Sequence, residues 1–340
     1  MRENRNRTPD RVVLAGGGRW ARILLLELTK LLPAGVPVEI VSPSASDVMR
    51  QWLRDAKNLG DRKMIVRADF PDTVEPSAFA LAVVANRPAD HFASAIGLIE
   101  RGYHVFVEKP LTTDPIEACR LVERGAQLKR AVMAGLAQLF APYIAAFRSR
   151  LPFAAGDLVG VDIDWGDPAR ELRYGEFKQA DSRTGIAFDL VPHAWSLLRA
   201  FKPMSHDIKM ELTAVASDGD EINLKAATAQ CSCSIRLSRS ASDRRRYLVL
   251  RTTSQRAAFD FSNPPFTATI DGQSCFTLPE RTEADGGAVA HELRYFVQLA
   301  DNVSRGQEPP EHPAVGRFAI EHVELASSID RAIAARRAVS

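Results

Sequence analysis

The segment VVLAGGGRWA at Val12–Ala21 decides the fold of the N-terminal part of the chain. Its first four residues are an apolar run typical of a buried strand, and its glycines indicate a tight turn. Apolar residues then recur with the period of a helix from Trp20 to Leu31. A strand, a glycine turn and a helix in this order predict the first unit of an open α/β sheet that binds a nucleotide.

Further apolar runs alternate with helical stretches along roughly the first 150 residues. The predicted strands are Val12–Ala15, Val38–Val41, Met64–Arg67, Phe79–Ala85, His104–Val107 and Ala131–Gly135. The clearest predicted helices between them are His91–Arg101 and Pro115–Lys129. Strands and helices that alternate in this way predict a parallel, doubly wound sheet.

The pattern changes after Pro142. Leu158–Trp165 alternates like a strand with one solvent-exposed face, Phe188–Phe201 is helical, and Ile208–Phe276 is a series of β runs. Two predicted helices, Ala288–Arg305 and Val315–Arg337, follow. Strands in succession predict a mostly antiparallel sheet and an α+β domain.

At 340 residues the chain exceeds the size of one hydrophobic core. We predict a disordered tail at residues 1–10, a dinucleotide-binding Rossmann domain at 11–140, and an α+β domain for substrate binding and oligomerisation at 141–340. The tail and its neighbour Arg11 hold four arginines, but no apolar stretch follows them before the first strand. A signal peptide is therefore not expected, and we predict a cytoplasmic protein.

Composition excludes several partners. The formal net charge is only +2, which provides no electrostatic surface for nucleic acid or for an anionic membrane. No run reaches the ~18 apolar residues that span a membrane. Cys231 and Cys233 have no further ligands at metal-binding spacing, so no metal site is predicted.

The glycine turn provides the predicted cofactor site. In the G-x-G-x-x-G/A pattern, Gly16 makes the tight turn, Gly18 lets the backbone approach the pyrophosphate, and Ala21 lets the helix pack closely on the strand. The helix that begins at Arg19 and Trp20 presents free N–H groups and the positive end of its dipole to the phosphates.

The tip of the second strand indicates which cofactor binds. A carboxylate there would bind the ribose of NAD, but the chain has Ser42 and Ser44 at this tip, and Glu39 lies earlier, inside the strand. Serine hydroxyls can bind a 2′-phosphate, and Arg19 and Arg50 are candidate cations. The sequence therefore favours NADP, with NAD as the alternative.

Glu108-Lys109-Pro110 follows the fifth predicted strand and is the first candidate for chemistry. Ligands of open α/β sheets bind at the carboxyl ends of the strands, which is where Lys109 is expected. Hydride transfer at a carbonyl carbon needs a group that supplies or removes a proton, and lysine can do so because its pKa falls readily on desolvation. Glu108 would orient Lys109 or bind nearby backbone groups.

Asp189 and His193 are the second candidate pair. They are four residues apart on the predicted helix Phe188–Phe201, so they share one face. His193 would be a second acid–base group or a donor to the reacting oxygen, and Asp189 would bind the substrate or orient His193. Trp165 is a weaker candidate for substrate contact. The run 244–246, three arginines, is predicted to be a solvated strand edge or hairpin.

The glycine turn, Glu108-Lys109-Pro110 and Asp189-Leu-Val-Pro-His193 occur in the order and approximate spacing of the Gfo/Idh/MocA family, which this chain resembles from about residue 11 to 334. The resemblance implies an NAD(P)(H)-dependent oxidoreductase acting on a small polar substrate. It also implies a cofactor-side loop with Asn86 and His91, a possible cis peptide bond before Pro110, and a homodimer or homotetramer. Two alternatives remain open: reduction of an imine, and a nucleotide-binding regulator without turnover.

Overall fold

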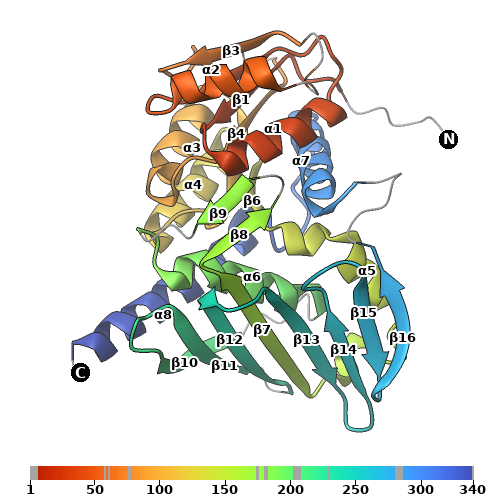
Figure 1. Ribbon diagram of the computed structural model, residues 1–340. Coiled ribbons are helices and arrows are strands. Elements are labelled where there is room, and N and C mark those ends of the chain that lie inside the picture. Colours follow the sequence, from red (N-terminus) through yellow and green to blue (C-terminus); the bar gives the residue numbers. More distant parts are fainter. Residues whose placement is uncertain are drawn as a thin grey trace, which may run out of the picture. The chain divides into compact units, whose positions relative to one another are not determined.

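The computed structural model describes residues 7–56, 59, 62–75, 78–173, 176–179, 183–201, 208–227, 230–279 and 286–338. The chain forms two compact units (Figure 1). The first consists of Met1–Leu136 and Val289–Val323, and the second of Ala137–Ala288 and Glu324–Ser340. Of the predicted disordered tail, residues 1–6 lie outside the described residues, and Asp10 accepts a hydrogen bond from the backbone N–H of Phe79 at 2.6 Å.

The first unit contains a six-stranded parallel sheet in the order β3-β2-β1-β4-β5-β6. This is the strand order of a Rossmann fold, so the predicted fold class is confirmed. The strands are β1 (Arg11–Ala15), β2 (Val38–Val41), β3 (Met64–Arg67), β4 (Ala80–Val84), β5 (His104–Glu108) and β6 (Val132–Gly135).

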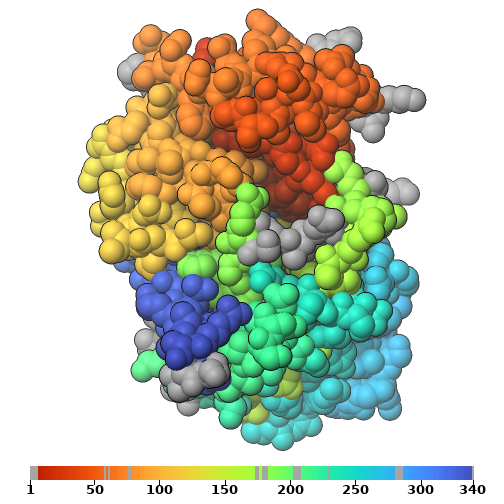
Figure 2. Space-filling view, turned by 60° about the vertical axis from the view of Figure 1, so that its left-hand side comes forward, coloured from red at the N-terminus to blue at the C-terminus, as the bar shows by residue number. Residues whose placement is uncertain are grey.

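Helices cover both faces of this sheet (Figure 1). They are α1 (Arg19–Leu31), α2 (Ser46–Asp55), α3 (His91–Glu100), α4 (Pro115–Gln127) and α7 (Ala288–Ser304), with a short 3₁₀ turn η1 (Pro88–Asp90) before α3. Because both faces are covered, β4 and β5 are buried along their whole length, which explains their apolar sequences. Only Met49 of α2 is buried, and this helix lies at the surface of the unit (orange in Figure 2).

Helix α7 joins the first unit after the chain has formed most of the second unit. It packs on β5, where His104 Nε2 lies 2.9 Å from Ser304 Oγ and the rings of Phe106 and Phe296 are 5.8 Å apart. Alternate residues of β5 therefore point toward α7. The predicted helix Val315–Arg337 forms as two pieces, η4 (Gly316–Ile320) and α8 (Glu321–Arg337), with Gly316 in the left-handed region at φ 55°.

His104 is buried in one fixed hydrogen-bonding state. The Ser304 hydroxyl donates to Ala300 O at 2.8 Å, so it accepts from His104 Nε2, while His104 Nδ1 accepts from Ala131 N at 3.0 Å. A proton on Nδ1 would face that N–H group and break the bond. Burial, assisted by the charge of Arg130, accordingly lowers the pKa of His104 to about 3.

We predict that His104 makes the protein less stable in acid. Its native pKa lies below the unfolded value of about 6.5, so the stabilisation is complete above pH 6.5 and is lost as the pH falls toward 3. At pH 5 the loss is about 2 kcal/mol. Urea unfolding should show that the loss of stability between pH 7.5 and pH 5 is about 2 kcal/mol larger in the wild type than in His104→Asn, because the other buried histidines contribute equally in both proteins. Equal pH dependence in both proteins would contradict the assignment.

The second unit is built on an eight-stranded mixed sheet in the order β10-β11-β12-β7-β13-β14-β15-β16. All neighbours are antiparallel except the pair of β12 and β7, which confirms the predicted mostly antiparallel sheet. The strands are β7 (Gly160–Pro168), β10 (Lys209–Val215), β11 (Glu221–Ala227), β12 (Ser232–Ala241), β13 (Arg245–Arg251), β14 (Arg256–Asp260), β15 (Phe266–Ile270) and β16 (Gln273–Leu278).

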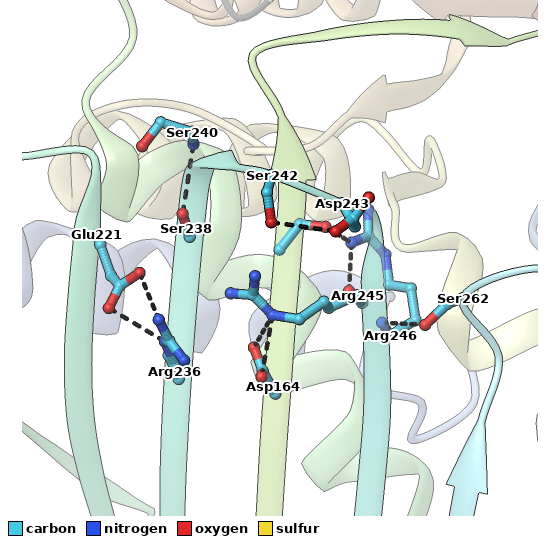
Figure 3. A network of polar contacts seen from close by, with 11 residues as sticks. Asp164, Glu221, Arg236, Ser238, Ser240, Ser242, Asp243, Arg245, Arg246 and Ser262 are labelled. Carbon is cyan, nitrogen blue, oxygen red and sulfur yellow. Dashed lines mark hydrogen bonds and ion pairs between the residues drawn. The ribbon is translucent and has the colours of Figure 1, made fainter.

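Helix α6 (Ile186–Phe201) packs on one face of this sheet against β7 and β12. The opposite face carries ion pairs across neighbouring strands, including Glu221 with Arg236 and Asp164 with Arg245 (Figure 3). The unit also contains η2 (Ala137–Phe140), α5 (Pro142–Ser149), η3 (Ala155–Asp157) and the hairpin β8 (Arg170–Arg173) and β9 (Glu176–Gln179). In the described parts of both units, no helix is both long and apolar enough to span a bilayer.

Candidate active site

The glycine turn has the geometry that the sequence predicts for binding a pyrophosphate. Gly16 has φ 138°, and a Cβ there would lie 2.6 Å from the carbonyl oxygen of Ala85, so a side chain at this position would collide with the end of β4. A Cβ on Gly18 would meet no atom within 4 Å, so this position borders open space. No side chain caps α1 at Gly18, and its first turn has no acidic residue. The turn therefore fits a bound diphosphate.

The tip of β2 lies against the same turn. Ser42 is 3% exposed, and a Cβ on Gly17 would overlap its hydroxyl. Glu39 is buried in the strand and forms ion pairs with Arg11 at 3.7 Å and with Arg67. Its carboxylate is thus engaged away from the tip. Two serine hydroxyls follow β2, the buried one of Ser42 and the exposed one of Ser44.

Lys109 directly follows β5 and is partly exposed. Its backbone N–H donates to Oε2 of the buried Glu108 at 3.1 Å, and the Lys109–Pro110 peptide bond is cis, as the family resemblance implies. Burial raises the pKa of Glu108 to about 7, whereas interactions with the Trp20 indole N–H and with Lys109 oppose this rise. Glu108 thus lies near both Lys109 and the first turn of α1.

Two buried histidines hold the turn that follows Lys109. His91 Nδ1 lies 2.7 Å from Pro110 O, and its Nε2 lies 3.3 Å from Asn86 O. Burial lowers the pKa of His91, so the ring is neutral and has a single N–H group. The shorter distance indicates that Nδ1 carries this hydrogen and donates it to Pro110 O. His322 Nε2 accepts from Leu111 N at 3.2 Å, and burial lowers the pKa of His322 to about 3, so the ring keeps this acceptor.

The predicted loop residues Asn86 and His91 thus lie together, and their side-chain nitrogens are used within the protein, whereas Oδ1 of Asn86 is buried without a hydrogen-bond partner among the described residues. Asn86 Nδ2 donates to Ser94 Oγ at 2.8 Å, and His91 is only 1% exposed. Both residues support the Lys109 turn and the start of α3. A direct contact of either residue with the cofactor stays a prediction.

The second unit positions the other candidate pair on α6. Asp189 lies in the first turn of this helix and His193 one turn later, both partly exposed. His193 Nδ1 is 3.2 Å from Gln138 Oε1. An amide oxygen can only accept, so Nδ1 carries the hydrogen and the lone pair of the neutral ring is on Nε2. Nε2 is then the nitrogen that can take a proton.

His193 is also held by an aromatic contact with β7. Its ring stacks on Trp165 with 4.4 Å between centroids and 10° between planes. The guanidinium carbon of Arg246 lies 3.6 Å from the Trp165 ring centroid, and the same guanidinium forms a buried ion pair with Asp167. Trp165 is 3% exposed, so it supports His193 and does not offer a surface for substrate.

The prediction that residues 244–246 form a solvated strand edge is wrong for Arg246, which is 2% exposed. Arg246 pairs in register with Trp165 on the face of the sheet that α6 covers. Arg245 is its neighbour on β13 and therefore points to the other face, where it pairs with Asp164 (Figure 3). Alternation along the strand thus gives adjacent arginines opposite environments.

Comparison with known proteins agrees with this geometry. The Gfo/Idh/MocA family model, described as "Oxidoreductase family, NAD-binding Rossmann fold", matches residues 11–136. Residues 11–136 are therefore similar to the NAD-binding Rossmann part of this oxidoreductase family. The matched segment contains the glycine turn, the tip of β2, the Asn86 loop and Lys109.

Three individual proteins are also similar to this chain. YceM of Salmonella typhimurium, a curated protein with an oxidoreductase name, is 39% identical over 72 residues, which is 21% of this chain and 24% of YceM. The chain thus matches about a quarter of that relative. A 3-ketoreductase from Actinomadura kijaniata, solved with TDP-benzene and NADP, has TM-score 0.68 and 17% identity over 95% of this chain and 96% of its own. An inositol dehydrogenase homologue from Azotobacter vinelandii, solved with NADH and myo-inositol, has TM-score 0.69 and 16% identity over 96% and 97%.

Among the predicted site residues, the first unit brings together Gly16, Gly18, Arg19, Trp20, Ala21, Ser42, Glu108 and Lys109 around the carboxyl ends of its strands. Asp189 and His193 lie in the second unit. Sequence reasoning missed Gln138, Arg246 and His322 as supporting residues. No local signal marks Gln138 or His322, whereas strand alternation could have predicted that one arginine of 244–246 faces inward.

Proposed function

We propose that this protein is an NADP(H)-dependent oxidoreductase of the Gfo/Idh/MocA type, which transfers a hydride between the nicotinamide and a carbonyl or alcohol carbon of a small polar substrate. One observation carries the proposal. A glycine turn with open space at Gly18 and a lysine at the end of β5 belong to the same Rossmann sheet, and Glu108 bonds the backbone of Lys109 and lies near Trp20 in the first turn of α1. The bound nicotinamide would supply or accept the hydride at its C4 atom.

The residues of the chain would handle the proton. In the oxidising direction, the C–H bond of the alcohol gives its hydride to the cofactor while the O–H bond gives its proton to a base. In the reducing direction, the carbonyl carbon receives the hydride and its oxygen receives the proton. Lys109 and His193 are the proposed acid–base groups, and Asp189 is proposed to bind a polar group of the substrate. Hydrogen bonding of His193 Nδ1 to Gln138 supports a role for Nε2 as the reacting nitrogen.

The choice of NADP rests on β2. Glu39 is held by Arg11 and Arg67, and the tip presents Ser42 and Ser44 without a carboxylate that would repel a 2′-phosphate. Arg19 is the proposed cation for this phosphate because it lies in the glycine turn at the start of α1, and Arg50 of α2 is the second candidate.

The names of two structural relatives support the proposed substrate class. The A. kijaniata relative is named as a 3-ketoreductase and the A. vinelandii relative is solved with myo-inositol. Both names are consistent with a polyhydroxylated or sugar-like compound as the substrate of this protein. Assembly into a dimer or tetramer is proposed on the family resemblance.

Titration with NADPH and NADH, followed by nicotinamide fluorescence, tests the cofactor assignment. We expect NADPH to bind at least tenfold more tightly, a difference of about 1.4 kcal/mol. Ser44→Asp should reduce this preference by placing a carboxylate at the tip of β2, and Ser254→Asp, on an exposed turn of the second unit, is the control. Equal binding of both cofactors would contradict the choice of NADP, and binding of neither would contradict the proposed enzyme.

Turnover assays separate the remaining alternatives. Oxidation of NADPH with a keto sugar supports the proposed reaction, whereas oxidation only with an imine supports imine reduction. Tight NADPH binding without turnover on either class would indicate a regulator.

A further inference from the structure

A buried carboxylic acid lies next to the Lys109 turn. Glu292, on α7, is 0% exposed, and neither of its carboxyl oxygens has a hydrogen-bond partner among the described residues. A buried carboxylate without a partner costs several kcal/mol, so this group needs either a counter-charge or a proton. The neighbourhood of Glu292 shows which of these it has.

The packing of α7 on β5 places Glu292 opposite Glu108. His104 meets Ser304, and Phe106 meets Phe296 two residues further along the strand. Glu108 follows on the same side of β5, and Glu292 lies one helical turn before Phe296, on the same side of α7. The strand and the helix run in opposite directions, so the two glutamates form the next pair in this series.

β6 leaves room for this pair. A Cβ on Gly135 would lie 3.0 Å from Glu108 Oε1 and 2.8 Å from Phe106 Cζ, so glycine is the residue that accommodates both side chains. Oε2 of Glu108 already accepts from the backbone N–H of Lys109. Oε1 is therefore the oxygen that can accept a further proton.

Among the described residues, the one charged group that acts on the pKa of Glu292 is an anion, Glu108. Burial raises its pKa well above the usual value, and the charge of Glu108 raises it further. No other described group contributes to this rise. Titratable or charged groups on α7 and the segments that contact it are Arg7, His104, Glu108, Lys109, His291, Arg294, Tyr295, Asp301, Arg305 and His312.

We propose that Glu292 carries a proton at neutral pH and donates it in a hydrogen bond to Glu108, so that a buried carboxyl pair keeps Glu108 ionised beside Lys109. Glu292 is then a positioning residue, since it acts on Lys109 only through Glu108. The catalytic consequence rests on the proposed function. Without the hydrogen bond from Glu292, the buried Glu108 would hold a proton more strongly. A protonated Glu108 has no negative charge and would stabilise the Lys109 ammonium less.

Two substitutions separate this role from a purely structural one. Glu292→Gln keeps an N–H donor for Glu108 but cannot ionise, whereas Glu292→Leu fills the same space without a donor. Infrared difference spectra of protein labelled with ¹³C at the glutamate carboxyl carbons report protonated carboxyl groups. Pulsed acylation with acetic anhydride at different pH values, read by mass spectrometry, reports the protonation of Lys109, with the exposed Lys63 as internal reference.

At pH 7.5 we expect the band of a protonated carboxyl in the wild type and its loss in Glu292→Gln. The pH midpoint of Lys109 acylation should stay unchanged in Glu292→Gln and fall by about one unit in Glu292→Leu, while that of Lys63 stays constant in both. Absence of the band from the wild type, or identical Lys109 midpoints in all three proteins, would overturn the proposal. NADPH binding measured on the same samples tests the proposed function separately, because neither readout needs cofactor or substrate.

Discussion

Lys109→Ala is expected to lower turnover by about 10²- to 10⁴-fold while leaving NADPH binding within a few-fold of wild type. The substitution removes the proposed proton donor at the end of β5 but leaves the glycine turn of α1 and the tip of β2 unchanged. Glu108 still accepts the backbone N–H of residue 109 in the variant, because that bond does not involve the lysine side chain. Steady-state kinetics with a substrate that the wild type turns over, together with nicotinamide fluorescence, measures both effects.

Lys63→Ala is the matched control for Lys109→Ala. Lys63 is an exposed lysine that directly precedes β3 in the same sheet, and its removal should change neither turnover nor binding. Unchanged turnover in Lys109→Ala would move the acid–base role to His193 alone. A simultaneous loss of binding and turnover would instead show that the side chain supports the cofactor site.

Arg246→Ala is expected to have the largest effect on stability, a loss of about 3–5 kcal/mol. The substitution leaves the carboxylate of Asp167 buried without its ion-pair partner, since the two side chains are only 3% and 7% exposed. It also removes the guanidinium from the ring of Trp165, on which His193 stacks. Thermal and urea unfolding of the variant measure the loss, and the folded fraction should show reduced turnover because His193 loses its support.

Arg245→Ala provides the comparison within the same strand. Arg245 also pairs with an aspartate of β7, Asp164, but these side chains are 27% and 30% exposed on the other face of the sheet. Such a pair contributes about 0–1 kcal/mol. Similar destabilisation by the two substitutions would mean that burial does not distinguish the two ion pairs, and the account of Arg246 would then be wrong.

Much of the fold could be predicted from the sequence because buried parallel strands are apolar along their whole length. The predictions Val38–Val41 and Met64–Arg67 match β2 and β3 residue for residue, and His104–Val107 lacks only the last residue of β5. The packing of α7 with the first unit could not be predicted. Its apolar residues indicate a buried face but do not encode that this face meets Phe106, which lies 190 positions earlier.

The residues of the candidate site also divide into those that a local sequence pattern marks and those that it does not. Gly16, Gly18 and Lys109 could be identified because a tight turn and a strand end each leave a local mark in the sequence. Gln138, Glu292 and His322 could not, since each acts through a partner that is distant in the chain. Arg246 was misjudged because three consecutive arginines resemble a solvated surface, and only the pairing of β13 with β7 reveals its partner Asp167.

The return of residues 289–323 to the first unit has a consequence for how the protein is made. When the ribosome has completed β6, the chain has all six strands of the first sheet but lacks α7 and His322. At that stage Phe106 and Glu108 have no cover on one side, and Leu111 lacks the acceptor for its N–H group. The nucleotide-binding half therefore matures only after His322 has been translated, 187 residues beyond the end of β6, and translation proceeds at some 5–20 residues per second. A gene fragment that ends after β6 would therefore encode an incomplete nucleotide-binding unit. A complete unit requires residues 1–136 together with residues 289–323.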